Sequence, residues 1–437
     1  MFYNKFLEKF ALPIGDFINN SQFIKDLRYW RNVDTYSEKE LKQLQASNLK
    51  KLLKHAVSKA TYYKGIALRG NSPIEWLSNF PILSKEDLRN NQKLILTEDT
   101  SKLTKISSSG STGINTSVYM NSRDLSSLRA GLIHWWEWSG YKMGMPLIQT
   151  GISPDRGVLK SIKDFLFNTT YVSAFSHTDN QLKKICKKLS RKSNFFLVGY
   201  ASSLNVIASY AIKNNYNIQL KAIISLGDKL FSQYRKNLYA AFNCEVFDTY
   251  GSAEGFLIAA QADNEYLYVL SPQTYIEIVD HNNNPVPDGE LGHIVVTRLD
   301  GYAMPLIRYK IGDLGILLPK SKYPKNRKFQ YPILQQIIGR DTDIVKTPKG
   351  KVLVVHSFTG IFEYFTEIKQ FKVVQLTLDG ISIEYIPSDD FTDKVLEKIK
   401  NEIQKNIEEE HFVISFKRVS RILPTQSGKP QIIESHL

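Results

Sequence analysis

Between residues 103 and 255, short apolar runs alternate with glycine-containing turns and with amphipathic stretches of helical spacing. In chain order these segments include MPLIQTG (145–151), NFFLVGY (194–200), SSLNVIASYAIKNN (202–215), LKAIISLGDKL (220–230), FSQYRKNLYAAF (231–242) and CEVFDTYGSAEG (244–255). A repeated succession of strand, glycine turn and helix is typical of an α/β sheet with ligand-facing turns at its strand ends. We therefore predict an α/β fold for this part of the chain.

The regions on either side follow other patterns. Residues 37–64 place leucines three or four positions apart behind a Ser37–Glu40 capping box, and FPILSKEDLRNN (80–91) has a second serine cap, so both predict helices. From residue 260, apolar alternation around the loop NNNPVPDG (282–289) predicts antiparallel β structure.

A new unit begins near residue 340, where a strand, a helix, two strands, a long helix and a further strand predict a small α+β domain. A chain of 437 residues is too long for one ordinary core. We therefore expect a large domain at 1–339 and a small one at 340–437.

The net charge of +14 comes from 57 Lys and Arg against 43 Asp and Glu. It is dispersed and accompanies no zinc-finger, basic-zipper or RNA-binding motif, so nucleic-acid binding is disfavoured. Peripheral contact with a membrane surface stays an alternative. The cysteines Cys186 and Cys244 lack CxxC spacing, which excludes a disulfide framework and fits a reducing cytosol. No signal peptide or long apolar run is visible, so we expect a cytoplasmic protein without a transmembrane segment.

Residues 107–113 read SSSGSTG. A loop of glycines and hydroxyl residues between strands can turn backbone N–H groups and hydroxyls toward an anion, because no large side chain blocks the approach. The stretch lacks the GK[ST] of a Walker motif. Read alone, it fits a flexible turn equally well.

Four further motifs follow it: DTYGSAEG (248–255), PLIRYKIGDLG (305–315), IIGRDTDIVKTPKG (337–350) and LPTQSGKP (423–430). Each is commonplace by itself, since Glu254 alone reads as a surface acid, Asp313 as a turn aspartate and Lys429 as an exposed lysine. Their order and separations, however, resemble those of the adenylate-forming (AMP-dependent acyl-CoA synthetase) superfamily. Within it, the whole chain is most similar to the phenylacetate–CoA ligase branch, particularly to CapK-type proteins of polysaccharide-biosynthesis loci.

The resemblance implies a large adenylation domain and a small mobile C-terminal domain. It also implies an AMP-forming acid–thiol ligase, which uses ATP and Mg²⁺ to convert a carboxylic acid into an acyl-AMP and then transfers the acyl group, most directly to CoA. Transfer to an amine, a hydroxyl or a carrier thiol is the alternative. A catalytically silent nucleotide-binding scaffold is another.

Residue by residue, the resemblance implies the following roles. Lys429 is the mobile lysine of adenylation, Glu254 holds Mg²⁺, and Thr112 belongs with these two to the catalytic set. The ATP contacts are Ser108, Ser109, Gly110, Ser111, Thr112 and Gly113 at the β- and γ-phosphates, Gly227 and Asp228 beside adenine, Tyr250 stacked on adenine, Gly251 and Ser252 at the α-phosphate, and Asp313 and Arg340 at the ribose.

The chain departs from the family pattern at the domain boundary, where Thr342 stands in place of the usual hinge aspartate. Trp135, Trp136 and Tyr200 lie where the family shapes its acyl pocket, although a tryptophan-rich helix is more often part of a core. His134 has no evident partner in the sequence and is interpreted as structural. The sequence names neither the acid nor the oligomeric state.

Overall fold

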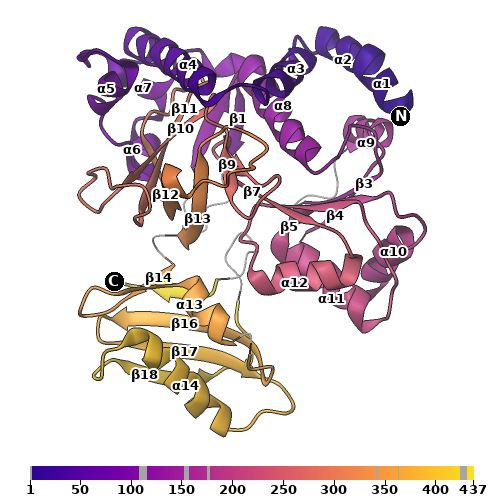
Figure 1. Cartoon of the computed structure of the whole chain (residues 1–437), viewed down its shortest axis with the longest axis vertical. Coiled ribbons are helices and arrows are strands. Elements are labelled where there is room, and N and C mark those ends of the chain that lie inside the picture. The colour runs from indigo at the N-terminus through magenta and orange to yellow at the C-terminus, as the bar shows by residue number, and fades with distance from the viewer. Residues whose placement is uncertain are drawn as a thin grey trace.

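The structure is a computed structural model, and it describes residues 2–107, 116–151, 157–174, 178–340, 343–362, 364–423 and 431–437 (Figure 1). A large N-terminal part contains an 11-stranded sheet, and a smaller C-terminal part contains a four-stranded sheet of its own. The predicted α/β class, with a large domain followed by a small one, is confirmed.

Helices dominate the first hundred residues. The Ser37 and Ser84 side chains accept hydrogen bonds from the backbone N–H groups of Glu40 and Asp87, which confirms the predicted capping box at Ser37 and the predicted serine cap at Ser84. The elements are α1 (Phe2–Phe6), the π-helical η1 (Leu7–Ala11), α2 (Leu12–Ile18), α3 (Phe23–Val33), α4 (Glu38–Lys59), η2 (Thr61–Tyr63), α5 (Pro73–Ser78), α6 (Lys85–Asn90), α7 (Gln92–Ile95) and η3 (Thr100–Lys102).

The large sheet has the strand order β10-β11-β12-β13-β9-β8-β7-β6-β5-β3-β4. Its strands are β3 (Leu147–Gly151), β4 (Thr169–Ser173), β5 (Phe196–Tyr200), β6 (Ala222–Leu226), β7 (Val246–Ser252), β8 (Phe256–Ala260), β9 (Leu267–Val269), β10 (Thr274–Val279), β11 (Gly292–Arg298), β12 (Tyr309–Leu317) and β13 (Ile333–Arg340). The neighbouring pairs among β3, β4, β5, β6 and β7 are parallel. All neighbouring pairs in the rest of the sheet, from β7–β8 to β11–β10, are antiparallel. The antiparallel structure predicted after residue 260 is therefore confirmed.

Helices cover both faces of the parallel strands, which explains why these strands are apolar runs and not alternating ones. One face packs on α10 (Asp179–Leu189), α11 (Ala201–Lys213) and α12 (Ser232–Phe242), and the other packs on α3 and α8 (Ser122–Trp138). Helix α9 (Gly157–Leu166) and the 3₁₀ turn η4 (Lys320–Lys322) complete this part. No helix among the described residues is long and apolar enough to cross a membrane.

The C-terminal part has its own core, built from residues between Val345 and Ile433. A three-residue strand near the C-terminus, β19, was not predicted; it pairs in parallel with β16. The elements are β14 (Ile344–Lys346), β15 (Val352–Val354), α13 (Val355–Phe362), β16 (Ile368–Thr377), β17 (Gly380–Pro387), α14 (Lys394–Ile407), β18 (Val413–Arg418) and β19 (Ile433–Ser435).

Candidate active site

Three neighbouring parallel strands end at the same edge of the large sheet. Strand β5 ends at Tyr200, β6 ends one residue before Gly227, and β7 contains Tyr250 and ends at Ser252. The register pairs Tyr200 with Leu226, so the ends of β5 and β6 are level. Ligands of open α/β sheets bind at the carboxyl ends of the strands. Several of the predicted adenine, α-phosphate and acyl residues therefore share one edge.

The turn after β6 is shaped by Gly227, whose φ of +81° favours glycine. A Cβ at this position would lie 2.5 Å from Cε1 of Tyr200, so the tyrosine ring packs directly on the turn. Asp228 accepts a hydrogen bond from the backbone N–H of Ser202 at 3.2 Å and another from Ala201, at the start of α11. Asp228 therefore holds the turn against the helix, while its contact with adenine stays a prediction.

Tyr250, Asp313 and Arg340 come together from β7, β12 and β13. The Tyr250 hydroxyl donates to Oδ2 of Asp313 at 2.7 Å, and Nε of Arg340 lies 3.1 Å from Oδ1 of the same carboxylate. Burial, reinforced by Asp313, raises the pKa of Tyr250 well above its ordinary value, so the phenol remains a donor. The carboxylate is thus fixed in orientation by one neutral donor and one cation.

Glu254 lies beside this cluster and is only 6% exposed. Tyr309 donates its hydroxyl to Oε1 of Glu254 at 3.2 Å, and burial together with that carboxylate raises the pKa of Tyr309. Burial lowers the pKa of Arg340, but the carboxylates of Asp313 and Glu254 outweigh this effect and raise it. The cluster therefore combines the Arg340 guanidinium, which stays protonated, with the carboxylates of Asp313 and Glu254.

A Mg²⁺ ion that arrives with ATP needs one or two protein carboxylates, because phosphate and water oxygens supply its other ligands. Glu254 meets this requirement. Within the described ranges, no group of three or more His, Cys, Asp or Glu side chains could hold a metal ion without a substrate.

The predicted phosphate loop joins β1 (Thr104–Ser107) to β2 (Ser117–Met120), which pair antiparallel with Ser107 opposite Ser117. The loop residues named above, Ser108, Ser109, Gly110, Ser111, Thr112 and Gly113, lie outside the described residues. So do Thr342 and Lys429, and all of these assignments remain predictions.

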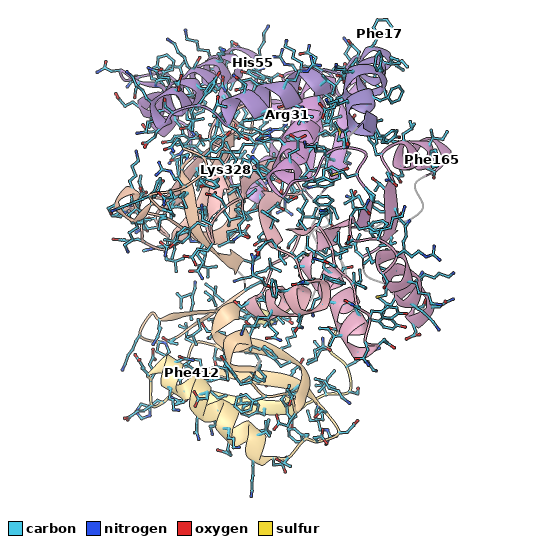
Figure 2. The ribbon with its side chains drawn as sticks, turned by 45° about the vertical axis from the view of Figure 1, so that its right-hand side comes forward. Phe17, Arg31, His55, Phe165, Lys328 and Phe412 are labelled. Atoms are coloured by element: carbon cyan, nitrogen blue, oxygen red, sulfur yellow. The ribbon has the colours of Figure 1, made fainter. Side chains whose placement is uncertain are left out.

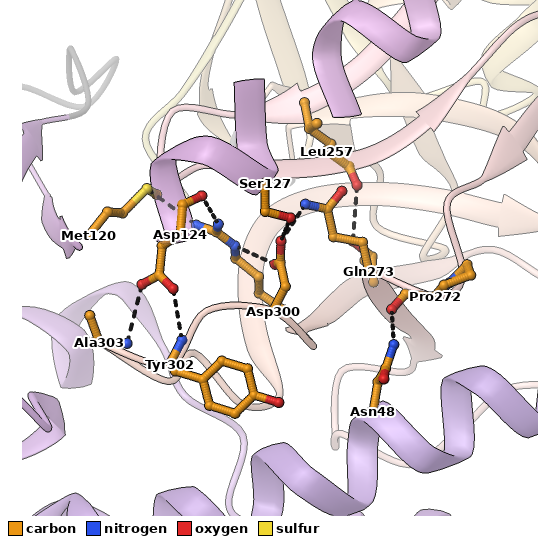
Figure 3. Close-up of polar contacts among 12 residues, drawn as sticks. Asn48, Met120, Asp124, Ser127, Leu257, Pro272, Gln273, Asp300, Tyr302 and Ala303 are labelled. Atoms are coloured by element: carbon orange, nitrogen blue, oxygen red, sulfur yellow. Dashed lines mark hydrogen bonds and ion pairs between the residues drawn. The ribbon is translucent and has the colours of Figure 1, made fainter. Parts of the chain in front are cut away.

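Arg298 is buried between β2, which follows this loop, and the turn that contains Glu254. Arg298 donates from Nη2 to the carbonyl of Asp124 at 3.0 Å and from Nη1 to Sδ of Met120 at 3.3 Å, and its Nε lies 2.9 Å from Oδ1 of Asp300 (Figure 3). A Cβ on Gly255 would overlap the Met120 side chain. The residue after Glu254 must therefore be small for β2 to approach.

The two aspartates of this network have further donors (Figure 3). Oδ2 of Asp300 accepts from Ser127 at 2.6 Å and from Gln273 at 2.7 Å, while Asp124 accepts from the backbone N–H groups of Tyr302 and Ala303. Burial raises the pKa of Asp124 to about 6. The sequence analysis missed this network because its members are scattered between residues 120 and 303.

The comparisons with known proteins agree with this geometry. No family model matches the chain. It is 26% identical over 405 residues to protein CapK of Staphylococcus aureus, covering 89% of this chain and 88% of CapK. It is 25% identical over 338 residues to the phenylacetate-coenzyme A ligase of Aromatoleum evansii, covering 72% of this chain and 73% of that ligase. The chain belongs to the adenylate-forming superfamily. Its branch is that of CapK and the phenylacetate–CoA ligases.

Solved structures of adenylate-forming ligases share the fold. The structure of 2-hydroxyisobutyryl-CoA ligase in the postadenylation state, in complex with R3-HIB-AMP, superposes with a TM-score of 0.74 at 16% identity and covers 93% of this chain and 91% of that one. ATP-bound MatB from Rhodopseudomonas palustris gives a TM-score of 0.55 at 15% identity, with 77% of this chain and 68% of that one covered.

Two residues predicted for the acyl pocket of this adenylate-forming protein lie in the core. Trp135 and Trp136 are 3% and 4% exposed, and they belong to the same buried cluster as Phe196 and Val198 of β5. The indole N–H groups of both tryptophans find no acceptor among the described residues. Tyr200 lies on the same face of β5 as Phe196 and Val198, because side chains alternate along a strand. Burial supports the core interpretation for the tryptophans, and their acyl role stays a prediction.

His134, interpreted as structural, has a partner that the sequence did not reveal. Its Nε2 lies 3.1 Å from Oδ1 of Asp34, an oxygen that also accepts from the Tyr331 hydroxyl at 3.0 Å. The other oxygen of Asp34 accepts from Nε1 of Trp138 at 3.0 Å. This buried network ties α8 to the loop after α3 and supports the structural interpretation.

One residue near the predicted nucleotide site did not stand out in the sequence, although it lies within the SLGDKL turn. Lys229 follows the glycine turn and donates from Nζ to the carbonyl of Ile338 at 2.6 Å, just before the predicted domain boundary. Burial lowers the pKa of Lys229 to about 8. Phe231, two residues further on, packs against the C-terminal core. The turn after β6 thus contacts both sides of the boundary.

Proposed function

We propose that this protein activates a carboxylic acid with ATP, forms an acyl-AMP and pyrophosphate, and then transfers the acyl group to the thiol of CoA. The observation that supports this most directly is the Tyr250–Asp313–Arg340 cluster at the strand-end edge of the sheet. The phenylacetate-coenzyme A ligases among its relatives support the same activity.

In this proposal Asp313 binds ATP through the ribose. The Tyr250 bond at 2.7 Å and the Arg340 contact at 3.1 Å orient its carboxylate toward the two ribose hydroxyls, which donate to it. Tyr250 stacks on adenine, and the Gly227 turn lies beside the base. Hydroxyls and N–H groups of residues 107–113 bind the β- and γ-phosphates.

The adenylation step needs no protein nucleophile. A carboxylate oxygen of the acid attacks the α-phosphorus, a new P–O bond forms, and the bond to the β-phosphate oxygen breaks as pyrophosphate leaves. Glu254 would hold Mg²⁺, which when bound would neutralise phosphate charge. Lys429 supplies a second cation where negative charge accumulates, so positioning and electrostatics provide most of the rate.

In the second step the CoA thiol attacks the acyl carbonyl and AMP leaves. We propose that the C-terminal domain, 340–437, rotates between the two steps about the segment that contains Thr342, because a few residues at an element boundary can absorb such a hinge motion. The contacts of Lys229 with Ile338 and of Phe231 with the C-terminal core lie beside this hinge.

Both substrates, ATP and CoA, are supplied in the cytoplasm, so we place the protein there. The resemblance of the motifs to those of CapK-type proteins of polysaccharide-biosynthesis loci supports a place in polysaccharide biosynthesis.

The test is ATP–pyrophosphate exchange with a panel of aromatic, short-chain, fatty and amino acids, followed by product analysis with and without CoA. The proposal predicts exchange that depends on one class of acid and a thioester that requires CoA. An amide or ester formed without CoA would favour direct transfer. ATP binding without exchange, for every acid, would favour the silent scaffold.

A further inference from the structure

A row of large apolar side chains is exposed along the N-terminal helices. Its members are spaced three or four residues apart, which places them on one side of a helix. Their exposed fractions run from 43% to 89%. We call this row the N-terminal stripe, and it consists of Tyr3, Phe6, Phe10, Ile14 and Phe17.

The other side of these helices is held against the body of the protein. Leu7 is fully buried beside Gly144, and Asn4 donates from Nδ2 to the carbonyl of Lys142 at 3.3 Å. Glu8 forms an ion pair with Arg31 at 2.6 Å. Tyr3 also lies against Gly144, so it marks the edge of the stripe. Phe6, Phe10, Ile14 and Phe17 face outward because the opposite side of the helices is anchored.

Helix α9 extends the apolar surface. The Tyr3 hydroxyl donates to the carbonyl of Leu166 at 2.5 Å, so the two segments are in contact. On α9, Ile162, Phe165 and Leu166 are 53%, 84% and 43% exposed. Figure 2 shows Phe17 and Phe165 projecting from the same end of the molecule. We call the N-terminal stripe together with Ile162, Phe165 and Leu166 the apolar corner.

The charge around the stripe is positive. Lys5 and Lys9 are exposed, and neither has a carboxylate within ion-pair distance in the described part of the chain. The acids of the same segment are engaged: Glu8 pairs with Arg31, and Asp16 accepts from the backbone N–H groups that begin α3. Exposed aromatic rings flanked by unpaired lysines are typical of helices that lie in a membrane interface.

We propose that the apolar corner binds an anionic membrane surface, with its phenylalanine rings in the boundary between headgroups and acyl chains and with Lys5 and Lys9 near lipid phosphates. A second copy of the chain is the less favoured occupant. In a two-fold symmetric contact through this corner, each copy would bring the same unpaired lysines to the other, and like charges would repel. The net charge of +14 also attracts the chain to an anionic surface.

The test is co-sedimentation of the full chain with vesicles of equimolar phosphatidylglycerol and phosphatidylcholine, compared with pure phosphatidylcholine. We expect binding to the anionic vesicles that weakens with salt. Phe10→Ser and Phe17→Ser should each lower the partition coefficient about tenfold, since each removes an aromatic ring from the interface. Lys5→Glu with Lys9→Glu should abolish the preference for anionic vesicles.

Leu376→Ser is the matched control, because Leu376 is 65% exposed on the C-terminal domain and Phe10 is 58% exposed. It should leave vesicle binding unchanged, and all variants should keep the melting temperature of the wild type. Vesicle binding that Phe10→Ser and Phe17→Ser leave intact would overturn the proposal. So would a dimer, seen by sedimentation velocity, that Phe17→Ser dissociates in the absence of lipid. Neither result depends on the proposed enzymatic function.

Discussion

Replacing Asp313 by asparagine tests the nucleotide site at its centre. The substitution keeps the size of the side chain and an acceptor for the Tyr250 hydroxyl, which lies 2.7 Å away, but it removes the negative charge opposite Arg340. A hydrogen bond to a charged group stabilises by about 1.5–3 kcal/mol and a neutral one by about 0.5–1.5 kcal/mol. The difference is about 1–1.5 kcal/mol for each of two ribose hydroxyls.

Since about 1.4 kcal/mol corresponds to a tenfold change in affinity, the total of about 2–3 kcal/mol means that Asp313→Asn should raise the KM for ATP roughly 30- to 140-fold. The assay is ATP–pyrophosphate exchange at varied ATP, with AMP affinity measured by calorimetry. Tyr250→Phe removes only the orienting bond and should have the smaller effect, about tenfold or less. Asp389→Asn, at a carboxylate that is 98% exposed, is the matched control and should change nothing. Unchanged ATP and AMP affinities in Asp313→Asn would refute the assignment.

Three further predictions concern the surroundings of the site. Glu254→Gln should raise the Mg²⁺ concentration for half-maximal exchange about tenfold; an identical Mg²⁺ titration would remove Glu254 from the metal site. Arg298→Met should lower the free energy of unfolding by about 3–5 kcal/mol in urea titrations, because it removes the cation beside the buried carboxylate of Asp124 and the partly exposed carboxylate of Asp300. A loss below about 1 kcal/mol would contradict this. Burial raises the pKa of Asp248 to about 7, so the folded state retains a proton that the unfolded chain releases near pH 3.8. The free energy of unfolding of the wild type should therefore fall as the pH rises from 3.8 to about 7. Asp248→Asn should weaken that fall, and parallel curves for both proteins would show that Asp248 does not cause it.

Local patterns predicted the fold better than they predicted the contacts of the site. The capping boxes at Ser37 and Ser84 and the apolar strands of the parallel sheet follow from residues close in sequence. By contrast, β19 has three residues and exists only because it pairs with β16 about sixty positions earlier in the chain. The Arg298 network and the Asp34 partner of His134 also depend on long-range contacts, which no local pattern specifies.

The same distinction applies within the site. Tyr250, Asp313 and Arg340 were named from the order of their motifs, and the fold places them in contact. Lys229 lies inside a noted motif, SLGDKL, but its partner is a backbone carbonyl 109 residues away. Trp135 and Trp136 are buried, as is more common for the tryptophans of a tryptophan-rich helix.

The central claim is that this chain forms an acyl-AMP, and carboxylate-dependent exchange of labelled pyrophosphate into ATP tests it most directly. The account predicts exchange with one class of acid for the wild type. It also predicts a loss of several orders of magnitude in Lys429→Ala, with unfolding unchanged. No exchange with any acid in a folded preparation would contradict the claim. Full exchange in Lys429→Ala would contradict the role of that lysine.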